Sequence, residues 1–427
     1  MERNAMKDLL LWKEREDRKP LIVRGARQVG KTWLIKEFAR LAYHKSVYVN
    51  FEEDEILRNI FQNDFDIQRI KTAIQLRLQT SIDEETLLIF DEIQAAPRGI
   101  MSLKYFCENA RNQPVIAAGS LLGISLHHGD SFPVGKVDFI DLYPLSFPEY
   151  LKAVGEDQAL SLIEDKRWED LVYVRDRLIA HLKTYYYIGG MPEAVQAYLK
   201  RHDLQEVRRI QQSILSTYDN DFSKHAPYEQ VPRIRMVWNS IVGQLAKENK
   251  KFIYGTLREG ARAKDFELAI EWLKDAGLVY KVKRVKSGEL PLNAFEDLSA
   301  FKIYMLDVGL LAAMAKLPAT TLAESNTLFL TYKGALTEQY TFQQLHTITD
   351  FIYYWSAENS TGEIDFLIQK ANRIIPIEVK AEENLKSRSL RSFVSRHEGI
   401  HGLRFSMSDY REQEWMTNIP LYAIHIP

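Results

Sequence analysis

A glycine-rich octapeptide near the N-terminus limits the possible folds more than any other stretch of this chain. It fits the pattern G-x-x-x-x-G-K-[ST], whose backbone N–H groups surround phosphate oxygens, and it consists of Gly25, Ala26, Arg27, Gln28, Val29, Gly30, Lys31 and Thr32. A short apolar run at 20–24 precedes it, and a run with helical spacing at 33–39 follows it. This motif requires a strand, a loop and a helix in that order, so a glycine-rich surface turn is the less favoured alternative.

The chemistry of this loop predicts a bound nucleotide and a metal ion. Gly25 and Gly30 allow tight backbone turns, and the N-terminus of the following helix adds partial positive charge. Lys31 is expected to reach the β- and γ-phosphates, and the Thr32 hydroxyl is expected to hold Mg²⁺. We therefore predict ATP and Mg²⁺ as the cofactors.

Two adjacent acids follow a second apolar strand, at 86–90. Asp91 is placed to hold the Mg²⁺ shell, and Glu92 is placed to accept a proton from the attacking water. Ordinary surface charge is the alternative, but it is less favoured one unit downstream of a phosphate-binding loop. The pair completes a predicted ATP-hydrolysing site.

A further strand at 114–118 ends in small polar residues, and Ser120 is the candidate for a polar contact near the γ-phosphate. Capping the next helix is an equally favoured role for Ser120. An additional strand, at 46–51, lies between the loop strand and the Asp-Glu strand along the chain. Together with Glu92 it indicates the additional-strand, catalytic-glutamate branch of P-loop ATPases.

Composition bounds the class of protein. With 427 residues we expect two to four domains, and the net charge of -2 gives no global field for nucleic acid. The one cysteine, Cys107, excludes internal disulfides and fits a cytoplasmic protein. The charged N-terminus has no apolar segment typical of a signal peptide, and no apolar run approaches the ~20 residues of a membrane helix.

The pattern along the chain predicts a multidomain α/β fold. Its parts are a P-loop core with a parallel sheet at 1–150, a helical lid at 151–228, a winged-helix unit at 229–290, a connector at 291–325 and a C-terminal domain at 326–427. Paired glycines before Pro192 predict a hinge where the lid folds back over the nucleotide. Pro192 is placed either against the adenine or at an ordinary helix start.

The winged-helix unit gives opposing signals about nucleic acid. Basic residues favour a nucleic-acid contact, and they are Lys247, Lys250, Lys251, Arg262 and Lys264. The outward positions of the predicted recognition helix are mostly acidic, with Asp265, Glu267, Glu271 and Asp275. Acids repel phosphates, so sequence-specific readout of bases is not expected here.

The last hundred residues carry a second constellation. If Ala371-Asn372 is a hairpin turn, Asp365 faces Glu378 and Glu363 faces Lys380 on the paired strands. Facing carboxylates ~5 Å apart are unfavourable unless a cation lies between them. We therefore predict a Mg²⁺ site formed by Asp365 and Glu378, with Glu338 as a further ligand. Lys380 is expected either to stabilise a pentavalent phosphate or to position the water. A hairpin with cross-strand ion pairs is the alternative.

The order of these parts resembles a bacterial and archaeal family of AAA+-like ATPases with a C-terminal restriction-endonuclease-like domain of the PD-(D/E)XK type. The matching residues are 25–32, 90–94, 142–147, 187–193, 333–336 and 377–380. The resemblance implies an ATPase core, a lid, a winged helix and a nuclease-like domain, and it places Pro192 by the adenine. Where relatives have Gly-Arg near the last core strand, this chain has Gly135-Lys136. The resemblance therefore assigns no arginine finger. Arg27 is a weak substitute, and a neighbouring copy in a homo-oligomer could supply one.

Two functions are compatible with these observations. The first is an ATP-controlled enzyme in which Glu338, Asp365, Glu378 and Lys380 bind or cut DNA. The second is a switch ATPase whose nucleotide state sets contacts with a protein or nucleic-acid partner, the C-terminal domain being a module that does not cut. An ATPase with no role on nucleic acid is the least specific alternative.

Overall fold

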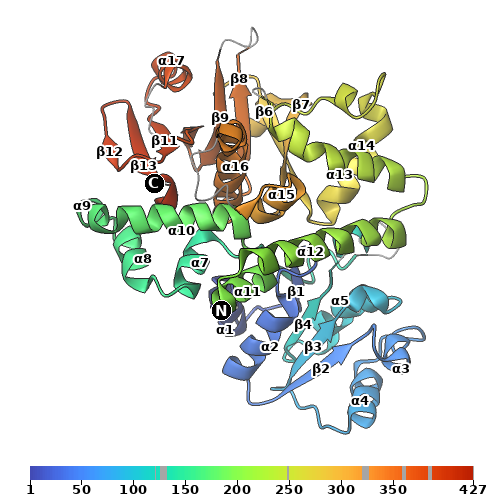
Figure 1. Ribbon diagram of the computed structural model, residues 1–427. Coiled ribbons are helices and arrows are strands. Elements are labelled where there is room, and N and C mark those ends of the chain that lie inside the picture. The colour runs from blue at the N-terminus through green and yellow to red at the C-terminus, as the bar shows by residue number, and fades with distance from the viewer. Residues whose placement is uncertain are drawn as a thin grey trace. The chain divides into compact units, whose positions relative to one another are not determined.

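The computed structural model describes residues 1–120, 122–125, 132–247, 250–319, 327–357, 362–382 and 387–426. Its chain divides into two compact units (Figure 1). Unit 1 comprises Met1–Tyr143 with Asp275–Gly277, and unit 2 comprises Pro144–Lys274 with Leu278–Pro427.

Unit 1 is built on a five-stranded parallel sheet in the order β2-β3-β4-β1-β5. The strands are β1 (Leu21–Arg24), β2 (Ser46–Asn50), β3 (Leu87–Asp91), β4 (Val115–Ala118) and β5 (Asp138–Asp141). The helices are α1 (Ala5–Glu14), α2 (Lys31–Ala42), α3 (Glu55–Arg58), α4 (Ile67–Leu78), α5 (Gly99–Asn109) and α6 (Leu122–Ser125). Because the strands are parallel, all their carboxyl ends lie at one edge, where α/β proteins bind ligands.

The strand order confirms the predicted parallel core and refines it. In the sheet, β4 lies between β1 and β3, whereas the strand that intervenes along the chain, β2, pairs only with β3 at the edge. The residues of β3 and β4 are all buried, and all of them are apolar except Asp91 at the end of β3. Trp12 of α1 is also buried, with its ring centroid 6.4 Å from that of Phe38 in α2, so it packs in the core of unit 1.

Unit 2 has a helical part and a mixed sheet. Its helices are α7 (Phe147–Ala153), α8 (Asp157–Glu164), α9 (Trp168–Leu171), α10 (Arg175–Ile188), α11 (Pro192–Arg201), α12 (Leu204–His225), α13 (Val231–Leu245), α14 (Ala263–Asp275), α15 (Val308–Met314), α16 (Thr327–His346) and α17 (Arg388–Arg396). Its strands are β6 (Val279–Val285), β7 (Glu296–Met305), β8 (Ile352–Ser356), β9 (Glu363–Lys370), β10 (Arg373–Val379), β11 (Gly402–Ser406), β12 (Arg411–Glu412) and β13 (Met416–Pro420).

The eight strands form one sheet in the order β12-β13-β11-β10-β9-β8-β6-β7. Helices α16 and α17 cover opposite faces (Figure 1). Phe366 of β9 packs near Phe342 of α16, while the next residue, Leu367, belongs to a core cluster with Leu390 and Phe393 of α17. Successive side chains of a strand point to opposite faces, so this alternation buries both faces of β9.

The sheet does not match the predicted domain boundaries at 290 and 325. Strand β6, at the end of the predicted winged-helix unit, pairs with β7 from the predicted connector and also pairs in parallel with β8 at Lys283↔Tyr353. The winged-helix segment, the connector and the C-terminal segment therefore share one sheet in one compact unit. Unit 1 likewise ends at Tyr143 rather than at 150. The polar stretch 320–326, predicted as a boundary, lies outside the described residues.

Candidate functional site

The predicted phosphate-binding loop joins the end of β1 to the start of α2. Gly30 is the residue before the helix and has φ 96°. Gly25 has φ 143°, and a Cβ on it would lie 2.2 Å from the carbonyl oxygen of Leu142. Positive φ and close approach of another backbone both require glycine, so the two glycines of the motif are explained by geometry.

Lys31 and Thr32 begin α2 and face the end of β3. Lys31 Nζ donates to the carbonyl oxygens of Gly25 and Ala26, both at 2.8 Å. Burial lowers the pKa of Lys31 to about 8, although Glu92 and Asp91 act in the opposite direction. Thr32 Oγ1 donates to Asp91 Oδ2 at 2.7 Å. A hydroxyl and a carboxylate are oxygen ligands of the kind that Mg²⁺ prefers, so Thr32 and Asp91 fit the predicted metal ion.

Glu92 and Ser120 also lie together at the ends of β3 and β4. The backbone N–H and the Oγ of Ser120 both donate to Glu92 Oε2 at 3.2 Å, and Gln94 Nε2 donates to the same oxygen. The carboxylate predicted to be the general base is thus held by two neighbours. Sequence patterns did not identify Gln94, or Tyr48, whose hydroxyl donates to Asp91 Oδ2 at 2.8 Å.

Arg3 is a further residue that the sequence patterns missed. It precedes α1, is buried, and donates to Val29 O in the loop at 2.9 Å and to Tyr143 O at 2.5 Å. Hydrogen bonds from a charged donor are stronger than neutral ones. Arg3 therefore fixes the loop against the segment that leaves β5, and only the fold brings these three positions together.

We expect Arg3→Met to weaken ATP binding about tenfold, since a net loss of about 1.4 kcal/mol corresponds to tenfold and hydrogen bonds to charged groups contribute about 1.5–3 kcal/mol. Binding of a fluorescent ATP analogue measures this. Lys7→Met, an exposed position on α1, is the control and should bind normally. Equal affinities of the two variants would show that Arg3 does not position the loop.

The predicted hinge at 189–192 lies in unit 2, between α10 and α11. Pro192 is the first residue of α11, which is the ordinary helix start. Its predicted adenine contact would involve both units and stays a prediction. A Cβ on Gly190 would lie 2.1 Å from Leu145 O, and a Cβ on Gly189 would lie 2.1 Å from Asp307 Oδ1. The glycines therefore serve close packing.

Asp307 fixes this hinge. Its Oδ2 accepts from Gly190 N at 2.6 Å, and its Oδ1 accepts from Leu310 N at 2.9 Å. Gln343 Nε2 of α16 reaches the same carboxylate at 3.3 Å. Burial raises the pKa of Asp307 from 3.8 to about 6, although these backbone N–H groups act in the opposite direction.

The raised pKa predicts a pH dependence of stability. The folded state keeps the proton of Asp307 where the unfolded chain loses it, so its contribution is fully present below pH 3.8 and is lost as pH rises through about 6. At about 1.4 kcal/mol per tenfold change in proton affinity, the loss is roughly 3 kcal/mol. Urea unfolding between these pH values should show this decline in the native chain and in the exposed control Asp350→Asn, but not in Asp307→Asn. If the free energy of unfolding of Asp307→Asn fell with pH as steeply as that of the native chain, the decline would not come from Asp307.

The C-terminal hairpin has the predicted register. Arg373 pairs with Lys370 and Ile377 pairs with Phe366, and Ala371 in the turn has φ 50°. Asp365 Oδ2 accepts from Val379 N at 2.8 Å. Asp365 and Glu378 therefore lie on neighbouring strands, as expected.

The predicted charge pairs differ from those found. Glu363 does not pair with Lys380 but with Lys302 Nζ of β7, at 2.5 Å, while Lys380 Nζ lies 3.0 Å from Glu378 Oε1. The register between β8 and β9 shifts between Tyr353 and Trp355. Such a β-bulge re-aims the side chains beside it, and this irregularity could not be predicted from the alternation of residues.

Glu338, which the sequence predicts as a metal ligand, contacts cationic and hydroxyl side chains of the protein instead. One carboxylate oxygen accepts from Lys250 Nζ, and the other accepts from Lys302 Nζ at 3.2 Å and from the Tyr304 hydroxyl. Burial raises the pKa of Glu338, but Lys250 and Lys302 outweigh it and lower the pKa to about 2. Among the described residues, no three His, Cys, Asp or Glu side chains are arranged to hold a metal ion. The residues present do not fit the predicted three-carboxylate centre.

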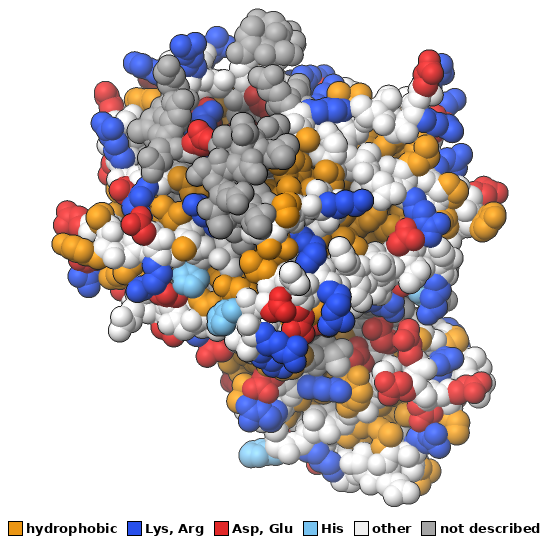
Figure 2. Space-filling model, in the orientation of Figure 1, with side chains coloured by type: hydrophobic (Ala, Val, Ile, Leu, Met, Phe, Trp, Pro, Cys, Tyr) orange, Lys and Arg blue, Asp and Glu red, His pale blue; other side chains and the backbone are white. Residues whose placement is uncertain are grey.

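Basic residues of the predicted winged-helix unit are also paired internally. Lys250 is turned toward Glu338. Between β6 and β7, Lys283 contacts Glu296 at 2.5 Å and Arg284 contacts Asp297 at 2.6 Å. On the face that Figure 2 shows, basic and acidic side chains of the described residues are interspersed. These pairings reduce the charge available to bind phosphates.

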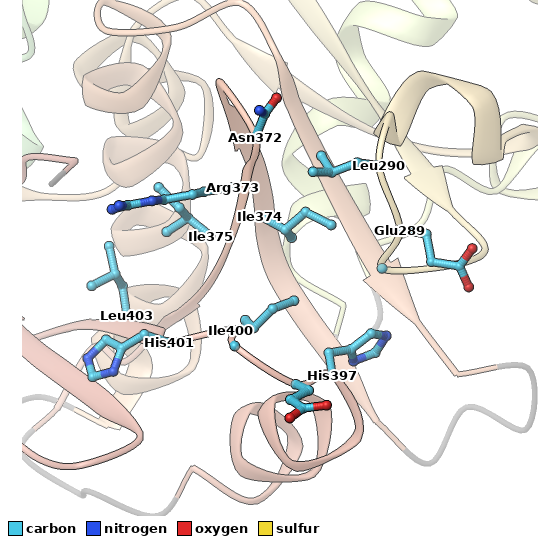
Figure 3. Close-up of a pocket in the computed structure, with 13 residues that line it drawn as sticks. Glu289, Leu290, Asn372, Arg373, Ile374, Ile375, His397, Ile400, His401 and Leu403 are labelled. Atoms are coloured by element: carbon cyan, nitrogen blue, oxygen red, sulfur yellow. The ribbon is translucent and has the colours of Figure 1, made fainter.

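A cavity of about 880 Å³ in unit 2 lies apart from every predicted site residue. Figure 3 shows its wall, with Ile374 and Ile375 from β10, Leu403 from β11, and His397 and His401 near the end of α17. His397 Nδ1 lies 2.8 Å from Phe393 O, and His401 Nε2 lies 2.9 Å from Thr417 Oγ1. Each histidine thus uses one nitrogen for local structure.

Comparison with family models agrees with the geometry of unit 1. Residues 17–151 match a family described as an AAA domain, so the loop, the Asp-Glu strand and the parallel sheet define a P-loop ATPase, and the chain is an ATPase. Residues 179–321 and 333–424 match two further families, each described as a domain of unknown function (DUF8612 and DUF4143).

Individual relatives are distant. An uncharacterized protein of Haemophilus influenzae is 25% identical over 327 residues, covering 72% of this chain and 71% of its own length. The Walker-type ATPase PABY2304 of Pyrococcus abyssi has a TM-score of 0.47 at 14% identity, over 74% of this chain and 95% of its own. The Aeropyrum pernix Orc1 protein, solved in complex with DNA, has a TM-score of 0.28 at 13% identity, over 75% and 92%. Such TM-scores do not establish a shared overall fold.

Within the described ranges, no helix combines the length and the apolar character that crossing a bilayer requires.

Proposed function

We propose that the chain is a switch ATPase, in which hydrolysis of Mg·ATP in unit 1 changes the conformation of unit 2 and thereby its contacts with a protein partner. Lys31 and the backbone N–H groups of 25–32 bind the phosphates, and Thr32 and Asp91 hold Mg²⁺. When bound, Mg²⁺ neutralises charge developing on the phosphates. Glu92 takes a proton from the attacking water, and Ser120 orients Glu92.

The contact between Thr32 Oγ1 and Asp91 Oδ2, at 2.7 Å, carries the hydrolytic part of this proposal. It joins the start of α2 to the end of β3, two elements that are separate in sequence. Glu92 is the next residue and is held by Ser120 of the adjacent strand. This arrangement supports the proposal, because it would hold a metal ion and a base at one edge of the sheet, as phosphoryl transfer to water requires.

The segment that leaves β5 supports the switch. Leu142 O lies against Gly25 of the loop, and Tyr143 O accepts from Arg3, which also holds Val29 O. Two residues further on, Leu145 N donates to Gly190 O at 2.7 Å. A displacement of the loop on nucleotide exchange would thus act on a short covalent segment that ends in the hinge of unit 2.

Hydrogen exchange on the full chain tests the switch. Glu92→Gln with ATP holds the unhydrolysed state, and the same variant with ADP gives the product state. Peptides covering 185–192 and 307–311 should exchange differently in the two states. Lys31→Ala should show no nucleotide effect at these peptides. Identical exchange with ATP and ADP in Glu92→Gln, despite saturated binding, would disprove the switch.

A second candidate is an ATP-controlled enzyme that cuts DNA with a restriction-endonuclease-like domain. The hairpin register favours it, because Asp365 and the Glu378-x-Lys380 pair lie on adjacent strands. Labelled single- and double-stranded DNA with Mg²⁺ or Mn²⁺ tests it. Cutting that is lost in Lys380→Ala and altered in Lys31→Ala would establish this enzyme.

A further inference from the structure

We propose that the carboxylate cluster of unit 2 is neutralised by cationic side chains of the same chain and takes no divalent cation. This inference deepens the proposed function, because a cluster without a metal is suited to a module that does not cut. It concerns Glu338, Glu363, Asp365 and Glu378.

Lys302 is the central cation of the cluster. Its side chain is fully buried, and its ammonium lies 3.2 Å from Glu338 Oε1 and 2.5 Å from Glu363 Oε1. Burial alone would lower the pKa of Lys302, but Glu338, Glu363 and Asp365 raise it above its usual value. Lys302 is therefore charged, and its ammonium lies between the carboxylates of Glu338 and Glu363.

Lys250 pairs with the second carboxylate oxygen of Glu338. Its ammonium contacts Oε2, the oxygen that Lys302 does not reach. The Tyr304 hydroxyl adds a further donor to Oε1. Both oxygens of Glu338 are thus occupied by protein donors, and a metal ion would have to displace a buried ammonium to reach them.

Glu378 has its own counter-charges. Lys380 Nζ lies 3.0 Å from Oε1. Arg404 is the cross-strand neighbour of Glu378, and its guanidinium is held by Asn418 at 2.8 Å and Ser387 at 3.1 Å. Among the described residues, Oε2 of Glu378 accepts no hydrogen bond. This oxygen is the atom of the cluster most open to a metal ion, so the test must include Glu378.

The negative charges of the cluster are offset without a metal. The carboxylates of Glu338, Glu363 and Glu378 face four cationic side chains, Lys250, Lys302, Lys380 and Arg404. Burial and the neighbouring Glu338 raise the pKa of Asp365 to about 7, so Asp365 carries less than a full negative charge at neutral pH. A divalent cation would add two uncompensated charges to a buried site, which is strongly unfavourable.

The origin of the cations explains why the C-terminal motif alone predicted a metal. All four carboxylates lie in residues that match one family model, 333–424. Lys250 and Lys302 lie in residues that match another, 179–321. Lys250 lies in the chain between α13 and α14, and Lys302 lies in β7. Lys302 reaches the cluster because β6 and β7 continue the C-terminal sheet.

Binding of Mn²⁺ to the full chain without nucleotide, followed by electron paramagnetic resonance, tests the proposal. The native chain and Lys302→Arg should leave Mn²⁺ free. Lys302→Met should bind Mn²⁺ and gain thermal stability from it, because its three carboxylates lose their central cation. Lys302→Met with Asp365→Asn should lose this binding again.

Several results would overturn the proposal. One is Mn²⁺ bound by the native chain and released in Asp365→Asn or Glu378→Gln; another is DNA cutting by the native chain that Lys380→Ala abolishes. Failure of Lys302→Met to bind Mn²⁺ would also count against it. If Lys302→Met does not fold, Lys250→Met replaces it with the same expectation. If the native chain does not hydrolyse ATP, the proposed function is refuted, but the Mn²⁺ results still decide the proposal about the carboxylate cluster.

Discussion

Replacing Glu92 with glutamine is expected to lower the rate of ATP hydrolysis by about 10²- to 10⁴-fold, the usual contribution of a general base. The amide keeps the shape of the side chain and still contacts Ser120, but it cannot take a proton from water. ATP should bind as tightly as to the native chain, since Lys31, Thr32 and Asp91 are the residues proposed to contact the phosphates and the metal. Phosphate release and equilibrium binding of ATP measure the two quantities separately.

Glu85→Gln is the matched control for this variant. Glu85 is exposed and lies just before β3, at the opposite end of the strand from Glu92, so its replacement should leave hydrolysis unchanged. A Glu92→Gln chain that hydrolyses ATP within a few-fold of the native rate would show that another group is the base. A loss of binding together with hydrolysis would instead assign Glu92 a structural role in the site.

Replacing Glu338 with alanine is expected to destabilise unit 2 by about 3–5 kcal/mol, because it leaves Lys250 and Lys302 without their shared partner in a buried site. The prediction follows from the two lysine contacts and the Tyr304 contact, which a metal ligand would not make. Because the pKa of Glu338 is lowered from 4.5 to about 2, its contribution is present above pH 4.5 and is lost as pH falls through about 2. Urea unfolding at neutral pH measures the effect.

Glu267→Ala, on the exposed side of α14, is the control and should change stability little. Unit 1 should keep its ATPase activity in both variants at low denaturant. A Glu338→Ala chain as stable as the native chain would remove the basis for the buried ion cluster. The native chain should also unfold at the same denaturant concentration in EDTA and in Mg²⁺.

Much of the nucleotide site could be predicted from local patterns. Gly25 to Thr32 are consecutive, and their backbone geometry follows from two glycines between a strand and a helix. Asp91 and Glu92 end an apolar strand, and parallel strands bring such ends to one edge. Tyr48 and Gln94 escaped prediction because their contacts with Asp91 and Glu92 depend on rotamers and on which strands are adjacent, which no local pattern contains.

The C-terminal site shows the limit of the same reasoning. The hairpin register was predicted correctly, since a two-residue turn fixes the pairing of the strands that flank it. The pairing of Glu363 was not, because the β-bulge in β9 depends on the neighbouring strand β8. Lys250 and Lys302, which pair with Glu338, lie 88 and 36 residues away from it in sequence. Their contacts with Glu338 therefore depend on the tertiary fold.

The sequence by itself determined that this chain is a P-loop ATPase and that Asp365 and Glu378 lie on neighbouring strands. In both cases the residues are joined by short chain segments whose geometry is restricted by sterics and hydrogen bonding. Only the tertiary structure decided that β6 and β7 extend the C-terminal sheet, that Arg3 holds the phosphate-binding loop, and that lysines neutralise Glu338. The physical reason is that buried charges must find partners wherever the fold supplies them, and those partners come from distant parts of the chain.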